Sequence, residues 1–172
     1  MSLFIKIDSD FSYDKSLIDN LTIEDKTEIS IDYISDFRSA KILRDIVSKI
    51  LKKIWVDLIW EKRLILVVDE LNNNAIEYWT KANDYNNLYI CIEKNNKKIN
   101  IKIEVSDKWN WKLPKKAKEM EELRRYKKQL WFENHNSIRW RWLFLIIEKL
   151  VNKLYFKDSK DWWLTVGIIK EL

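Results

Sequence analysis

The 172-residue sequence contains a single glycine, a single proline, a single cysteine and a single histidine. One cysteine, Cys91, excludes an intramolecular disulfide and any cysteine metal cluster. No apolar run reaches the length of a membrane-spanning helix. The N-terminal segment 1–8 lacks the basic start and apolar core of a signal peptide. We therefore expect a cytoplasmic protein without membrane contact.

The shortage of glycine coincides with an excess of tryptophan, of which there are 10. Average usage of glycine is roughly 7%, or about 12 residues in a chain of this length. Eight tryptophans lie where glycine is physically favoured, at expected helix ends, in a tight hairpin and in polar loops. Trp60 and Trp131 fit none of these three settings clearly. The eight are Trp55, Trp79, Trp109, Trp111, Trp140, Trp142, Trp162 and Trp163.

These positions suggest that UGA codons meaning glycine, as some bacterial lineages use them, have been translated as tryptophan. The competing interpretation is a Trp-rich ligand binder, for instance of carbohydrate, with an exposed aromatic platform. The positions favour recoding, because the tryptophans do not alternate along strands. UGG codons at these positions would exclude the recoding hypothesis. We call the chain with glycine at the eight positions the glycine-bearing form.

The net charge of +5 arises from dispersed lysine and arginine, with two local clusters at 115–118 and 124–128. A solvated face of a Lys-rich helix explains these clusters more simply than a nucleic-acid interface does. We therefore expect no direct contact with nucleic acid.

Hydrophobic periodicity predicts a two-layer α/β sandwich. One mixed, mainly antiparallel sheet would be covered on one face by helices, with an N-terminal extension at 1–28 that carries a short strand and one domain at 29–172. Strands are predicted at 3–7, 28–33, 88–93, 99–105, 154–157 and 164–170, and helices at 36–54, 61–78, 115–130 and 143–154.

The second predicted helix carries Glu70, Asn74 and Glu77 on one face, away from its apolar stripe. A glutamate can accept a proton, and an asparagine carbonyl oxygen can ligate Mg²⁺. Alone the pattern is weak, since such residues usually line a solvated face.

Two further segments gain meaning when tryptophan is replaced by glycine. The segment from Ser106 then becomes Ser-Asp-Lys-Gly-Asn-Gly-Lys-Leu-Pro, and that from Ile138 becomes Ile-Arg-Gly-Arg-Gly-Leu-Phe-Leu-Ile-Ile. A glycine pair that opens a helix lets backbone N–H groups and the helix dipole face phosphate oxygens. Arg139 and Arg141 add positive charge there.

Together, Glu-Leu-Asn-Asn-Asn-Ala, Asp-x-Gly-x-Gly and Gly-x-Gly-Leu-x-Leu resemble the three nucleotide-binding boxes of the GHKL (Bergerat-fold) ATPase superfamily. Within it, the chain is most similar to anti-sigma-factor serine/threonine kinases, from about Ile29 to the C-terminus. The resemblance implies a histidine kinase-like ATPase fold that binds ATP and Mg²⁺.

The resemblance also implies residue roles. Glu70 would be the general base, Asn74 the Mg²⁺ ligand, and Asp107 the acceptor for the adenine amino group. The segment 115–137, which contains the only histidine, His135, would be the ATP lid. Leu164 stands where the family has threonine, and Thr165 follows it. The other implied cofactor contacts are Trp109, Asn110, Trp111, Arg139, Trp140, Arg141, Trp142, Leu143 and Thr165.

The implied function is phosphorylation of a serine or threonine on an antagonist protein, together with sequestration of a sigma factor, by a homodimer. The alternative is a non-catalytic module of this fold that binds nucleotide or only a protein partner. Indole rings at 109, 111, 140 and 142 would fill the nucleotide site. We therefore expect ATP binding from the glycine-bearing form and not from the chain with tryptophan.

Overall fold

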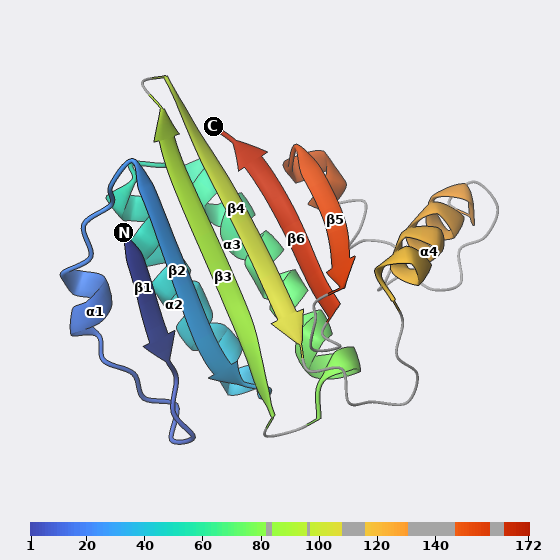
Figure 1. Ribbon diagram of the computed structural model, residues 1–172, viewed down its shortest axis with the longest axis horizontal. Helices are drawn as coiled ribbons and strands as arrows, with labels where there is room; N and C mark the ends of the chain where they lie inside the picture. The colour runs from blue at the N-terminus through green and yellow to red at the C-terminus, as the bar shows by residue number, and fades with distance from the viewer. Residues whose placement is uncertain (82–83, 96, 108–115, 131–146, 159–163) are drawn as a thin grey trace.

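A computed structural model describes the chain except residues 82–83, 96, 108–115, 131–146 and 159–163. One sheet of six strands, in the order β1-β2-β3-β4-β6-β5, is covered on one face by α2 and α3 (Figure 1). This confirms the predicted two-layer α/β sandwich. The elements are β1 (Ser2–Lys6), α1 (Ser16–Asp19), β2 (Lys26–Ile34), α2 (Phe37–Lys53), α3 (Leu58–Asn74), η1 (Ala75–Trp79), β3 (Tyr85–Asn95), β4 (Lys98–Asp107), α4 (Ala117–Leu130), β5 (Lys153–Asp158) and β6 (Leu164–Glu171).

The sheet is mixed and mainly antiparallel, as expected. Only β1 runs parallel to its neighbour, β2, and the other four pairings are antiparallel. The short strand of the N-terminal extension is thus the edge strand of this same sheet. Among the described residues, no helix is long and apolar enough to cross a membrane.

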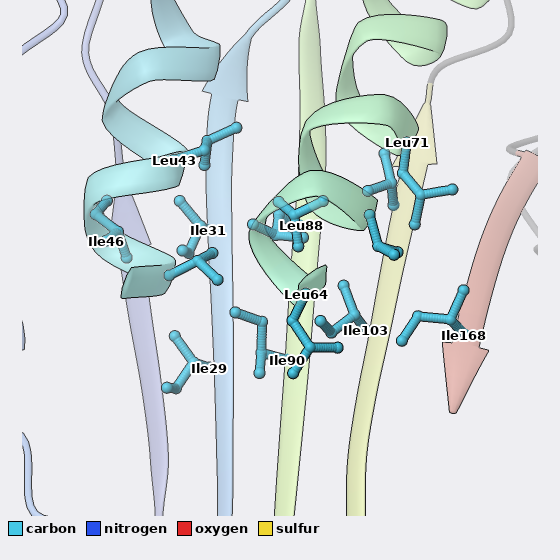
Figure 2. Close-up of a cluster of buried hydrophobic side chains, with 14 of the residues drawn as sticks. Ile29, Ile31, Leu43, Ile46, Leu64, Leu71, Leu88, Ile90, Ile103 and Ile168 are labelled. Carbon is cyan, nitrogen blue, oxygen red and sulfur yellow. The ribbon is translucent and has the colours of Figure 1, made fainter. Parts of the chain in front are cut away.

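The core lies between the sheet and the two long helices (Figure 2). Alternate residues of each strand point toward the helices, because side chains of a strand alternate between its faces. In the middle of the sheet these residues are aliphatic, and they pack against the apolar stripes of α2 and α3. The labelled members are Ile29, Ile31, Leu43, Ile46, Leu64, Leu71, Leu88, Ile90, Ile103 and Ile168.

Helix α3 begins earlier than the hydrophobic pattern predicts. The carboxylate of Asp57 accepts hydrogen bonds from the backbone N–H groups of Ile59 (2.8 Å) and Trp60 (3.0 Å). Such an N-cap satisfies amides that have no partner inside the helix. The cap therefore starts the helix at Leu58, before its apolar stripe begins.

Near the C-terminus, the observed helix and strand boundaries differ from the predicted ones. The described part of the helix expected at 143–154 is helical only at 147–150. The chain then turns into β5, whose first residue, Lys153, pairs with Ile169 of β6. The short helix α1 was not predicted, since its polar segment has no periodicity.

Trp55 occupies a glycine slot. It follows the C-cap residue Ile54 of α2 with a φ of 60°, in the left-handed region, and its side chain is 91% exposed. The N–H of Trp55 donates to the carbonyl of Lys52, and that of Val56 donates to the carbonyl of Leu51. These two bonds form a Schellman motif, which ordinarily places glycine at residue 55.

Trp79 lies at the second expected helix end, where it is the last residue of η1. The N–H of Thr80 donates to the carbonyl of Ala75 across the same six-residue span as at Leu51–Val56. This is one of the two hydrogen bonds of the motif, and the left-handed residue expected at Trp79 stays a prediction.

We predict that Trp55→Gly stabilises the protein by about 1 kcal/mol, because it relieves the cost of a side chain in the left-handed region. Urea denaturation measures this. Trp60→Gly is the matched control. Trp60 lies inside α3, where glycine costs about 1 kcal/mol, and Lys170 Nζ lies 3.8 Å from its ring centroid. The control should be destabilised, and a destabilised Trp55→Gly would contradict the assignment.

Candidate functional site

The most unusual described residue is Asp107, the last residue of β4. It is fully buried on the helix-facing side of the sheet. Neither of its carboxylate oxygens has a hydrogen-bond partner within the described part of the chain. Burial raises the pKa of this carboxyl group to about 8. An orphaned buried acid is costly to fold, and such groups in native proteins commonly serve a ligand or a reaction.

Asn74 lies at the C-terminal end of α3, one turn after Glu70. Its Nδ2 donates to the backbone carbonyl of Glu70 at 2.6 Å, and the residue is only 8% exposed. Asn74 is therefore not on the solvated face that the sequence suggested. Because the bond uses the amide NH₂ group, the oxygen Oδ1 remains to accept or to ligate. Glu70 is half-buried, and Glu77, in η1, is exposed.

The fold brings these residues to one end of the sheet. Both α3 and η1 contact β4, and η1 lies beside the end of β4 at which Asp107 is placed (Figure 1). Glu70 and Asn74 thus approach from the helix layer, while Asp107 approaches from the sheet. The π-helix directly after Asn74 is a form that often marks functional sites.

Thr165 does not join this group. In the register of β4 and β6, Asp107 pairs with Leu164 and Ser106 pairs with Thr165. Thr165 therefore points to the opposite face of the sheet, where its Oγ1 lies 2.8 Å from Oγ of Ser106. The neighbour of Asp107 on the helix-facing side is the aliphatic Leu164.

Part of the expected lid is a docked helix. The N–H of Ala117, at the start of α4, donates to the carboxylate of Asp158 in β5 at 2.7 Å. Met120 is buried in the core, and Arg124 donates to the carbonyl of Leu154 at 3.0 Å. Arg124 also pairs with Glu148 at 3.4 Å. Helix α4 is therefore anchored to β5 at its first two turns.

Eight other predicted contacts lie outside the described residues, as does His135. They are Trp109, Asn110, Trp111, Arg139, Trp140, Arg141, Trp142 and Leu143.

Sequence reasoning missed a buried polar group beside Asp107. Tyr33, Asn72 and Asn86 are fully buried, and Thr80 is nearly so. One signal was available, because Asn86 is in phase with the apolar positions 88, 90 and 92 of its strand. A polar residue at a core-facing position indicates a hydrogen-bonded or functional role.

Comparison with known proteins supports the fold alone. No family model and no curated protein matches the chain. A chain in the crystal structure of the SiaB–SiaC complex from Pseudomonas aeruginosa matches with a TM-score of 0.51 and 9% sequence identity. The match covers 83% of this chain and 89% of that chain.

The buried acid predicts a distinctive pH dependence of stability. The pKa of Asp107 is about 8 in the folded protein and near 3.8 in a free side chain, so the folded state binds more protons between these values. Stability therefore falls as pH rises through this window. Relative to Asp107→Asn, we expect the free energy of unfolding to fall by about 1.4 kcal/mol per pH unit between pH 5 and 7.

Urea denaturation at several pH values measures this difference. Asp36→Asn is the matched control. The hydrogen bond and charge of Arg38 hold the pKa of Asp36 at about 2, so that group titrates below this window. If the free energy of unfolding depends on pH in the same way for the wild type and for Asp107→Asn, Asp107 ionises normally and the prediction is wrong.

Proposed function

We propose that the glycine-bearing form is a regulatory protein that binds ATP with Mg²⁺ and transfers its γ-phosphate to a serine or threonine of an antagonist protein. The observation that carries the proposal is the orphaned carboxylate of Asp107, placed beside Asn74 and Glu70 at one end of the sheet. The role of each residue comes from the resemblance of the chain's sequence motifs to those of anti-sigma-factor kinases.

Asp107 suits recognition of the base. An adenine ring presents an amino group, which donates to a carboxylate oxygen, and neither oxygen of Asp107 has a donor within the described part of the chain. A hydrogen bond to a buried acceptor offsets the free-energy cost of its desolvation, which is on the order of 1–3 kcal/mol. The site thus gains most from a ligand that brings a donor.

Asn74 suits a Mg²⁺ ion that arrives with the nucleotide. Mg²⁺ keeps several waters and usually takes one or two protein ligands together with phosphate oxygens. The amide oxygen of Asn74 is one such neutral ligand. Among the described residues, no cluster of three His, Cys, Asp or Glu could hold a metal ion by itself. In this arrangement the triphosphate supplies the negative charge.

Glu70 suits the attacking hydroxyl. Its backbone carbonyl fixes Asn74, which places the Glu70 side chain one helical turn from the proposed metal ligand. A carboxylate there accepts the proton of a serine or threonine as the hydroxyl attacks the γ-phosphate. The bond between the γ-phosphorus and the β,γ-bridging oxygen breaks, and ADP leaves.

Partners follow from the resemblance and from the neighbour. The matched chain belongs to a two-protein complex, SiaB–SiaC, and it supports a regulatory role that works through protein contact. We propose an antagonist protein as the phosphate acceptor and a sigma factor as the sequestered partner. The homodimer implied by the resemblance belongs to the same proposal.

A non-catalytic interaction module is the second candidate, and the burial of the site favours it for the chain with tryptophan. Asp107 is 0% exposed and Asn74 is 8% exposed, so both side chains are shielded from solvent. In that chain, protein contact alone would remain.

We predict that Glu70→Ala in the glycine-bearing form retains ATP affinity within about twofold, whereas phosphate transfer falls by roughly 10²-fold or more, as loss of a general base does. Labelled ATP and the antagonist protein measure transfer, and equilibrium dialysis measures binding. Glu77→Ala, which removes an exposed carboxylate from η1, should change neither.

Intact transfer in Glu70→Ala would reject the mechanism. ATP binding without transfer in the parent form would support the non-catalytic candidate instead.

A further inference from the structure

A row of polar side chains crosses the helix-facing side of the sheet at the end where Asp107 lies. Tyr33 of β2 pairs with Asn86 of β3. The register that pairs Asn87 with Ser106 places Asn86 opposite Asp107 of β4. All three are fully buried. The next row inward is aliphatic and consists of Ile31, Leu88, Val105 and Val166.

Two hydrogen bonds fix the orientation of the amides around this row. The Tyr33 hydroxyl donates to Oδ1 of Asn72, which reaches down from α3, at 2.5 Å. The Thr80 hydroxyl donates to Oδ1 of Asn86 at 2.5 Å. Each bond occupies an amide oxygen, and each therefore leaves an NH₂ group as the remaining polar part of its side chain.

The remaining polar groups are complementary. The Nδ2 atoms of Asn72 and Asn86 are buried without a hydrogen-bond partner in the described part of the chain, as are both oxygens of Asp107. Two donor groups and one acceptor group therefore border the same buried region. Buried water molecules typically make about three hydrogen bonds to polar groups that otherwise have no partner.

We propose that an internal water joins the amides of Asn86 and Asn72 to one carboxylate oxygen of Asp107. Asn86 is thereby a positioning residue for Asp107, the residue proposed to bind adenine. The water and its two amides would hold one oxygen. The other oxygen would then be oriented toward the amino group of the adenine. This inference rests on the proposed function for its ligand, but the network itself does not require a nucleotide.

The network explains how a deeply buried acid can act as an acceptor. Burial alone opposes ionisation of Asp107, whereas hydrogen bonds to a carboxylate favour it. Within the described part of the chain, the groups that face it are the Tyr33 hydroxyl, the amides of Asn72 and Asn86, and the aliphatic Leu164. None of these brings a positive charge, so among the described groups the amides are the ones that can stabilise the ionised form.

The test is carbon-detected NMR titration of the Asp107 carboxyl in the full glycine-bearing chain without nucleotide. Asn86→Leu removes the donor at similar volume and should move the titration midpoint upward by about one pH unit. Asn86→Ser keeps a small hydroxyl donor and should restore part of the difference. Asn87→Ala is the matched control, because Asn87 bonds Ser30 and Asp32 on the opposite face.

Nucleotide binding supplies the second readout. A midpoint shift of one unit corresponds to roughly tenfold weaker ATP binding at pH 7, and Asn86→Leu should show this loss. An unmoved midpoint in both Asn86 variants would overturn the network. If Asn86→Leu does not fold, the Asn86→Ser titration alone decides. A shifted midpoint in a chain that binds no ATP would support the network and reject the proposed function.

Discussion

The aliphatic face that the six strands present to α2 and α3 is the constraint on which the rest of the structure depends. Apolar residues at alternate positions of β2, β3, β4 and β6 face the helices, and this pattern constrains the register of the pairings between these strands. The same register brings Tyr33, Asn86 and Asp107 side by side where the aliphatic rows end. The polar site is thus a continuation of the core pattern with different side chains.

Much of this fold could be predicted from the sequence, because period-2 and period-3.6 patterns are local signals. The strand at 99–105 and the helix at 36–54 are examples, and the structure places them at Lys98–Asp107 and Phe37–Lys53. Boundaries set by single side chains were not predictable from the pattern. Asp57 starts α3 three residues early through its cap, and pairing with β6 ends the last helix before residue 153.

The spacing of the helical residues of the candidate site was predictable, but their burial was not. Spacing placed Glu70 and Asn74 one turn apart, which the structure shows. It could not show that Asn74 turns its amide onto the carbonyl of Glu70, because that depends on the side-chain rotamer. Nor could it show that Thr165 faces away from Asp107, because that depends on the register of β4 and β6. Tyr33 and Asn72 were missed because their pairing spans 39 residues. The Schellman geometry at Trp55 gives the glycine hypothesis its structural support.

Calorimetric titration of ATP into the glycine-bearing form at pH 7, in buffers of different ionisation enthalpy, tests the central claim most directly. Burial raises the pKa of free Asp107 above its ordinary value, and adenine requires its carboxylate as an acceptor. Binding should therefore release protons, and Asp107→Asn should bind ATP more weakly and release none from this site. Absence of ATP binding, or equal affinity and proton release in Asp107→Asn, would contradict the account.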